Sequence, residues 1–211
     1  MPSADRLAGQ ASAPLRPVRL GTFDAVLEHG PNGVIHVRTS QTLPPYYATL
    51  SEPLEHWARV APDRVFLGQR DTAGDWRTLS YAQTLSHVKR IGAALLRRGL
   101  SAERPIAIIS GNDIEHALLA LAAMTVGIPY APISPAYSLM SSDFGKLRAI
   151  LKLLTPGLVF ANDGGPFARA LYETVPDDIE LVVTRNPLGD RPVTMFDDLL
   201  GDEDTAGVAA A

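Results

Sequence analysis

The sequence predicts an α/β domain built on a doubly wound parallel sheet, with a small β-hairpin near its N-terminus. From about residue 100 onward, short apolar runs alternate with amphipathic helical stretches, and the connections between them are short. One stretch, residues 104–137, contains a complete strand–helix–strand unit, in which two strands separated by a helix pair in parallel. The arrangement expected is of the flavodoxin or Rossmann type.

The central unit is expected to contain a buried strand over 105–110, a helix, and a second strand over 128–132. Asn112 is predicted to cap the helix, with Glu115 three residues later completing a capping box. Gly127 follows the helix, where a left-handed backbone favours glycine. The helix should pack on the sheet through residues that share one face at helical spacing, namely Ile114, Leu118, Leu121, Ala122 and Thr125.

Two small elements are predicted nearer the N-terminus. A β-hairpin is expected over 23–38, lying across the domain, because its turn contains the Asn-Gly pair typical of tight hairpins. A short helix should begin after Ser51 and end before Pro62, which cannot continue it. Its inward side chains are expected to be those of Leu54, Trp57 and Ala58.

An antiparallel pair of strands and a long helix are expected next. The strands over 65–69 and 76–79 are joined by a link too short for a crossover, so they should pair antiparallel. Ser80 should begin the helix with Gln83 as its capping-box partner, and Gly99 should end it.

The alternation of helices and strands continues beyond the central unit. A helix capped by Ser141 or Ser142 should run to Leu154, since Pro156 cannot belong to it. The elements expected after it are a strand over 157–161, a helix around 167–171, a strand over 179–184 and a helical turn over 195–200.

Three segments are expected along the whole chain. Residues 1–20, rich in proline and lacking the apolar core of a targeting signal, should form a mobile tail. Residues 21–200 should form the α/β domain, and residues 201–211 a linker or a truncated end.

Composition excludes several classes of function. The chain has 211 residues, a formal net charge of -4 and no cysteine. The acidic balance is unsuited to nucleic acid, and the lack of cysteine excludes disulfides, thiolate catalysis and cysteine-bound zinc. No apolar run approaches the roughly 20 residues that a membrane span requires, so neither nucleic acid nor a membrane is expected as a partner. A cytoplasmic location is the expectation.

Ligands of open α/β sheets bind beyond the carboxyl ends of the strands. This rule places residues 110–112, 134–138 and 162–165 near the edge of any pocket, and the candidate residues within them are Asn112, Tyr137 and Ser138. Backbone amides at the start of the Asn112 helix could hold an anion. Each candidate also has a structural interpretation, because Asn112 can simply cap its helix, and Tyr137 and Ser138 can be turn residues after two prolines.

Motifs that would assign chemistry directly are missing from the sequence. The segment 162–165 contains two glycines but matches neither phosphate-binding glycine pattern, so it is interpreted as a turn before a helix. The histidines show no metal-binding spacing, and no G-x-S-x-G elbow occurs. The sequence therefore assigns no catalytic residue, no cofactor-binding residue and no metal ligand.

Several stretches resemble the adenylate-forming acid–CoA ligases, also called the AMP-binding family. The likeness rests on RPIAII, on SGN followed by EHALLALAA, and on GIPYAPISPAYS, while LEHWA, APDRVFL and TLSYA are similar to the family's opening. Within the family, APISPAYS and GKLR followed by LLTPGLVF are most similar to the bacterial feruloyl-CoA synthases. The resemblance runs from about residue 43 to about residue 200.

The resemblance implies an enzyme that activates an aromatic acid with ATP and Mg²⁺ as its acyl-adenylate, and then transfers the acyl group to CoA. It also implies a phosphate loop ending in lysine, an aromatic adenine segment, a ribose-binding aspartate and a C-terminal lysine, none of which has a counterpart here. The chain is therefore expected to be the N-terminal part of such a ligase, inactive alone and binding no cofactor by itself. Its partner would be the remainder of the ligase, in cis or in trans.

Two hypotheses from other functional classes remain. The chain could be a free-standing module that binds a small anion at the start of the Asn112 helix. It could instead be the docking subunit of a split enzyme, in which case it should expose an apolar face.

Overall fold

The computed structural model describes residues 24–201, 205–209 and 211, so the tail predicted over 1–20 lies outside the described residues. The chain divides into two compact units, Met1–Tyr46 and Tyr47–Ala211.

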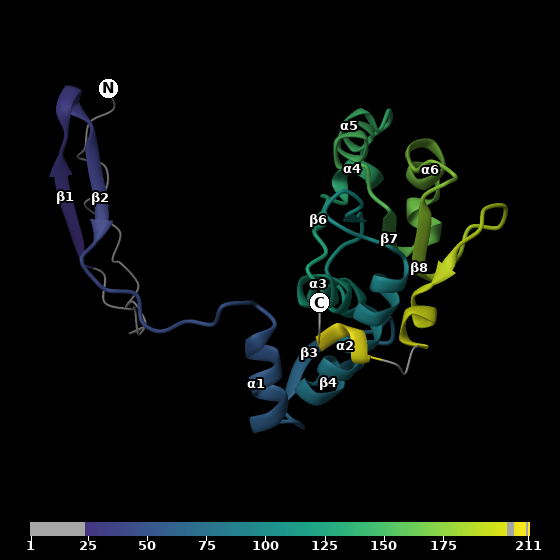
Figure 1. The fold of residues 1–211 in the computed structure, drawn as a ribbon. Coiled ribbons are helices and arrows are strands. Elements are labelled where there is room, and N and C mark those ends of the chain that lie inside the picture. The colour runs from purple at the N-terminus through teal and green to yellow at the C-terminus, as the bar shows by residue number, and fades with distance from the viewer. Residues whose placement is uncertain (1–23, 202–204, 210) are drawn as a thin grey trace, which may run out of the picture. The chain divides into compact units, whose positions relative to one another are not determined.

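The first unit contains the predicted hairpin. Strands β1 (Ala25–His29) and β2 (Ile35–Thr39) pair antiparallel (Figure 1). The turn between them has left-handed backbone at Asn32 (φ 59°) and Gly33 (φ 74°), the conformation that an Asn-Gly pair favours. The hairpin is confirmed, and its position across the domain stays a prediction.

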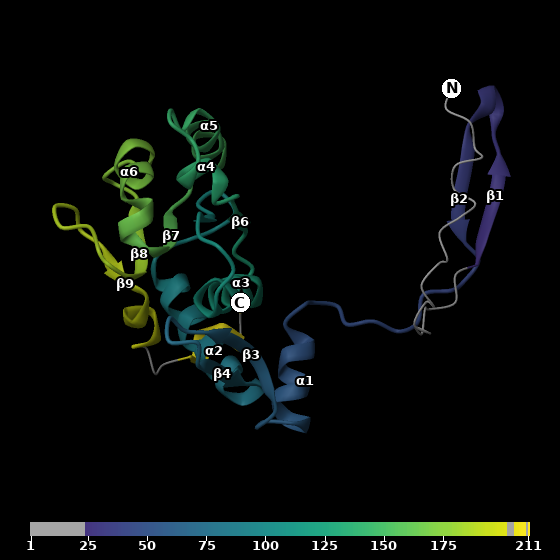
Figure 2. The ribbon, with the colours of Figure 1, turned by 180° about the vertical axis from the view of Figure 1, so that it is seen from behind.

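The second unit is built on a five-stranded parallel sheet with the strand order β6-β5-β7-β8-β9. Its first strand along the chain lies second in the sheet, which is the flavodoxin-like order. The predicted doubly wound parallel sheet is therefore confirmed, with β9 as an additional edge strand beside β8 (Figure 2). The strands are β5 (Ile106–Ile108), β6 (Tyr130–Pro132), β7 (Leu158–Asp163), β8 (Glu180–Arg185) and β9 (Thr194–Met195).

Helices cover both faces of the sheet because side chains alternate along each buried strand. Ile106 and Ile108 of β5 face helices α2 (Tyr81–Arg97) and α3 (Ile114–Thr125), whereas Ala107 faces α5 (Gly145–Leu154) and α6 (Gly164–Thr174). Figure 1 shows α2 with α3, and α5 beside α6.

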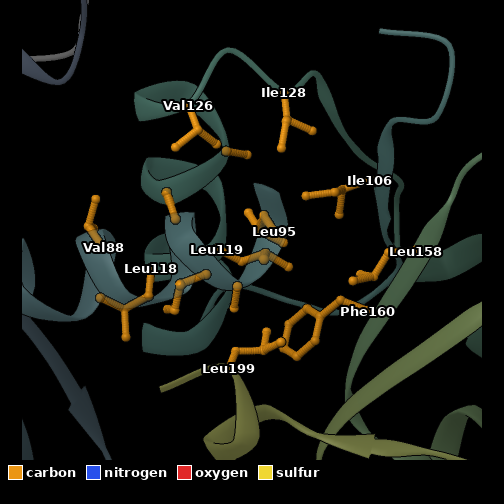
Figure 3. Packing of buried hydrophobic residues seen from close by; sticks show 14 of the residues in the cluster. Val88, Leu95, Ile106, Leu118, Leu119, Val126, Ile128, Leu158, Phe160 and Leu199 are labelled. Carbon is orange, nitrogen blue, oxygen red and sulfur yellow. The ribbon is translucent and has the colours of Figure 1, made fainter. Parts of the chain in front are cut away.

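The core under α2 and α3 extends beyond the sheet. On this face, strand side chains pack against the two helices and against the 3₁₀ turn Phe196–Leu200. This turn confirms the helical turn predicted over 195–200. Figure 3 shows Leu199 of this turn beside Phe160 of β7. Within the segment assigned to a linker, a further turn over Ala206–Ala209 buries Val208 in the same core.

Strands β3 (Val65–Arg70) and β4 (Trp76–Ser80) form the predicted antiparallel pair, and α2 begins with the predicted capping box of Ser80 and Gln83. Helix α1 spans Glu52–Val60 as expected. Trp57 of α1 was predicted to point inward, which is wrong, since it is 37% exposed. Its ring instead lies in a half-exposed aromatic group with the neighbouring rings of His56 and Tyr81.

The helix predicted to follow Ser141 or Ser142 begins later, at Gly145. Phe144 just before it has a left-handed backbone (φ 52°) and is buried. The Ser141 hydroxyl accepts a hydrogen bond from the Phe144 amide at 2.9 Å, so it stabilises the approach to the helix rather than the helix itself. A short helix, α4 (Ala136–Leu139), precedes this segment.

Helices long and apolar enough to cross a bilayer do not occur in the part of the chain that the structure describes.

Candidate functional site

The chain's connections diverge at one point of this sheet, and we call the region at the carboxyl ends of its strands there the crevice. From β5 the chain crosses to β6 on one side, and from β7 it crosses to β8 on the other. In open α/β sheets such a switch point is where ligands bind, outside the carboxyl ends of the strands. The candidate site is therefore the region that follows Ile108 of β5 and contains the end of β7.

A row of polar residues ends the apolar layer at this crevice. Ile108, Phe160 and Val182 are paired across β5, β7 and β8 and face α2 and α3. Two positions further along the three segments, and hence on the same face, are polar residues. This polar row consists of Ser110, Asn162 and Thr184.

The polar row contains buried atoms without protein partners. The hydroxyl oxygens of Ser110 and Thr184 are buried, and neither has a hydrogen-bond partner among the described residues. Buried polar atoms normally have such partners. These two hydroxyls therefore have hydrogen-bonding capacity that the described part of the chain does not use.

Asp113 is the charged member of the crevice. Burial raises the pKa of its carboxyl group, the hydrogen bond from the His116 amide opposes this rise, and the negative charge of Glu115 adds to it. A hydrogen bond with the Asn162 side chain also opposes the rise, but burial prevails, because the carboxylate loses more hydration than these two hydrogen bonds restore.

The predicted capping box of Asn112 and Glu115 is wrong. The N-cap of α3 is Asp113, whose Oδ1 accepts a hydrogen bond from the His116 amide at 2.6 Å, while Asn112 is exposed. The Glu115 carboxylate instead binds Arg77 of β4 through two contacts of 2.7 and 2.8 Å. A bidentate pair with a guanidinium is stronger than a bond to one backbone amide, so the long-range partner prevails.

The start of α3 does not fit an anion. The Ile114 amide donates to Oε1 of Gln69 in β3 at 3.0 Å, and the His116 amide already binds Asp113. Two carboxylates, Asp113 and Glu115, lie in the same turn and would repel a negative charge. The geometry gives no support to the hypothesis of an anion-binding module at this helix.

Asp163 forms a closed polar corner at the end of β7. Its carboxylate accepts hydrogen bonds from Nε of Arg185 at 2.8 Å, from Nδ2 of Asn186 at 2.9 Å and from the Gly165 amide at 3.0 Å. Burial would raise the pKa of Asp163, but these bonds outweigh burial and lower it. Asn162 and Asp163 belong to the strand and Gly164 begins α6, so the predicted helix is right and the predicted turn before it is wrong.

Tyr137 and Ser138 lie on the other side of the sheet from the polar row. Both belong to α4, and Tyr137 packs in the core under α5 and α6, with Nζ of Lys146 5.4 Å from the centre of its ring. Ser138 is 5% exposed, and its hydroxyl oxygen has no hydrogen-bond partner among the described residues. The structure therefore does not bring Asn112 together with these two candidates.

The described residues do not fit a magnesium nucleotide. Within that part of the chain, no group of three or more His, Asp or Glu side chains could hold a metal ion. The Asp163 carboxylate is occupied by three donors, and Asp113 is half-buried with a raised pKa. Neither carboxylate is available as a ligand of a hard cation.

The sequence placed Ser110 and Asn162 near the edge of a pocket, but it did not single out Asp113 or Thr184. A signal for Thr184 was present, because the apolar runs of β5, β7 and β8 are each followed by a polar residue at an equivalent position. Aligning the ends of the predicted strands would have grouped Ser110 with Asn162 and Thr184. The burial of Asp113 depends on how far α3 extends, which sequence periodicity does not determine to one residue.

The chain was compared with known protein families and sequences. The family model described as AMP-binding enzyme matches residues 54–201. One plipastatin synthase protein from Bacillus subtilis is 31% identical over 126 residues, which cover 57% of this chain and 5% of that protein. Another protein of the same synthase is 29% identical over 131 residues, which cover 60% of this chain and again 5% of the relative.

Solved structures show the same fold at low sequence identity. The luciferase-like enzyme from the nonluminescent Zophobas morio mealworm matches with a TM-score of 0.59 and 15% identity, over 78% of this chain and 38% of that one. The fatty acyl-adenylate ligase from L. pneumophila, solved with acyl adenylate and pyrophosphate, matches with a TM-score of 0.54 and 16% identity, over 76% of this chain and 25% of that one. This chain spans well under half the length of each.

Proposed function

The chain belongs to the AMP-binding enzyme family, and we propose that it is the N-terminal part of an adenylate-forming ligase that joins an aromatic acid of the feruloyl type to CoA. The observation that carries the proposal is the family match over residues 54–201, which includes the parallel sheet and its crevice. In the whole enzyme, the acid's carboxylate attacks the α-phosphorus of ATP and releases pyrophosphate. The thiol of CoA then displaces AMP from the acyl-adenylate.

The aromatic acid is the finer part of the proposal. Its support is sequence likeness to the feruloyl-CoA synthases in two stretches, residues 131–138 and residues 145–160. The first stretch forms the end of β6, the turn after it and most of α4, and the second forms α5 and the start of β7. Both therefore lie in the second unit, around the α5 and α6 side of the sheet.

We propose that this chain supplies one wall of the active site and does not catalyse alone. ATP and Mg²⁺ would be held by the remainder of the ligase, because Asp113 and Asp163 are unsuited to the metal. The remainder, in cis or in trans, is the proposed partner, CoA is the proposed second substrate, and the cytoplasm is the proposed location.

The test is ATP–pyrophosphate exchange with ferulate, benzoate and octanoate. We expect no acid-dependent exchange by the isolated chain. The native protein, purified from its source cells by an antibody against residues 118–146, should be well above 22.6 kDa in mass and should catalyse exchange with ferulate. Exchange by the isolated chain would refute its inactivity. Preference for octanoate by the native protein would refute the aromatic assignment.

One observation favours the alternative of a docking subunit. Large apolar side chains are exposed on α1 and on the β3–β4 pair, among them Val60 at 58%, Val65 at 57% and Trp76 at 61%. Such a group of exposed side chains is typical of an interface. A native mass equal to that of this chain would place the docking hypothesis first.

A further inference from the structure

A hollow lies at the edge of the sheet opposite the crevice. It has a volume of about 770 Å³, which is in the range of small-molecule sites. It is formed around the amino ends of β7 and β8, by the C-terminal ends of α5 and α6 and by the loop before β5. We refer to it as the amino-edge groove.

The inner surface of the amino-edge groove is apolar. Leu151 of α5, Val159 of β7 and Val175 after α6 all line it, and each is at most 6% exposed. Pro156 and Ile179 add further apolar surface. An apolar molecule or apolar group can therefore be shielded from water there.

Most acidic side chains at the groove already have partners. Glu103 accepts a hydrogen bond from the Ser101 hydroxyl at 2.8 Å, and Glu173 pairs with Nε of Arg169 at 2.9 Å. Asp177 lies 3.9 Å from the guanidinium of Arg191.

The basic side chains at the groove are less engaged than the acidic ones. Arg148 donates a hydrogen bond to the carbonyl of Glu173. Arg104 and Lys152 line the groove, and neither side chain forms a hydrogen bond or ion pair with any described residue. Of the four acidic residues in the lining, this leaves Asp178 as the one without a described partner. The unpaired charge is therefore mainly positive.

One wall of the groove is held rigidly by a buried arginine. Arg191, 8% exposed, donates hydrogen bonds to the carbonyls of Val175 at 2.7 Å, Pro176 at 2.6 Å and Ile179 at 3.1 Å. These bonds fix the loop between α6 and β8 in place. A wall that is already ordered adds little entropy cost when a ligand binds.

We propose that the amino-edge groove binds an amphipathic anion, whose negatively charged head pairs with Arg104 and Lys152 and whose apolar body lies on Leu151, Val159 and Val175. This inference does not depend on the proposed function. The groove is at the opposite edge of the sheet from the crevice. Its ligand would therefore bind away from the reacting groups and would not be a substrate of the proposed reaction.

Calorimetric titration of the 211-residue chain with octanoate and with uncharged octanamide tests the charged head. We expect octanoate to bind about tenfold more tightly than octanamide, because only octanoate has a charge to pair. Octyl phosphate, titrated in parallel, separates a carboxylate head from a phosphate head. Equal affinities of octanoate and octanamide, or no binding of octanoate, would overturn the proposal.

Substitutions locate the binding. Lys152→Gln and Arg104→Gln, both at exposed positions, should each weaken octanoate binding by about threefold to tenfold and leave octanamide unaffected. Lys146→Gln is the matched control, because Lys146 is on the same helix but outside the groove. If Lys146→Gln weakened octanoate binding as much as Lys152→Gln, the loss would reflect the net charge of the chain. That result would refute binding in the amino-edge groove.

Discussion

Gly164 lies directly against the backbone of Asn186, so closely that a β-carbon at Gly164 would collide with the carbonyl oxygen of Asn186. Asn186 itself has a left-handed backbone, with a φ of 50°. This approach brings the chain after β8 to the start of α6 and lets the Asn186 amide reach Asp163. The polar corner at the end of β7 therefore requires glycine at position 164.

Gly164→Ala should destabilise the fold by about 2–3 kcal/mol, because the new methyl group can be accommodated only if the backbone shifts. Urea denaturation measures this as a lower free energy of unfolding. Gly189→Ala is the control, since a β-carbon there meets no atom within 4 Å. Equal stability of the two variants would show that the loop at Asn186 moves freely.

Asp113→Asn should stabilise the protein more at pH 7 than at pH 4. Burial raises the pKa of Asp113 in the folded state, so the folded protein holds the proton more tightly than the unfolded chain. The wild type therefore loses stability as pH rises from the ordinary pKa of an aspartate through the raised one. Asparagine still caps the helix and does not ionise.

Unfolding free energies of both proteins at pH 4 and pH 7 measure the effect of Asp113→Asn. Asp163, whose pKa is shifted in the opposite direction, is present in both proteins and cancels in the comparison. A difference between the proteins that is independent of pH would contradict the prediction.

Arg77→Met should destabilise the protein by about 2 kcal/mol, since it leaves the carboxylate of Glu115, 8% exposed, without its bidentate partner. Glu115→Gln should lower the free energy of unfolding by less, because a buried neutral amide without a partner is less costly than a buried carboxylate without one. The double variant should cost less than the sum of the single variants, and a double-mutant cycle measures that coupling. If the effects of the single variants on the free energy of unfolding simply added up in the double variant, the interaction between Arg77 and Glu115 would contribute nothing to stability.

Ser110→Ala and Thr184→Val should leave stability unchanged or raise it by up to about 1 kcal/mol, because each removes a buried hydroxyl that has no partner among the described residues. Thr84→Val is the contrasting control, since its buried hydroxyl donates to the Ser80 carbonyl at 2.8 Å and should cost about 1 kcal/mol. Destabilisation by Ser110→Ala would show that bound water completes the polar row.

Local signals predicted much of this fold. The pattern at Ser80 and Gln83 predicts a capping box, and both of its hydrogen bonds are present because each joins atoms within a single turn. The glycine after α3, Gly127, has the expected left-handed backbone (φ 68°) for the same reason. Short continuous apolar runs, which reflect burial on both faces, alternate with amphipathic helical stretches, and this order was enough to predict the parallel sheet.

Predictions failed where a distant residue competes with a local one. Asn112 and Glu115 match the same capping pattern, but Arg77, 38 residues before Glu115, takes the carboxylate. Trp57 has the spacing of an inward residue, yet it stays at the surface among other rings. The candidate site depends on register between strands, so Ser110 and Thr184 could not be grouped by reading each run separately.

The hydrogen bond from the Ile114 amide to Gln69 joins residues 45 positions apart. The first turn of α3 is therefore completed only once the β3–β4 pair has docked, which links a local helix to a late, non-local folding event. Hydrogen exchange should report this link. The Ile114 amide should exchange at the rate at which the β3–β4 pair detaches, while amides in the middle of α3 exchange only with global unfolding.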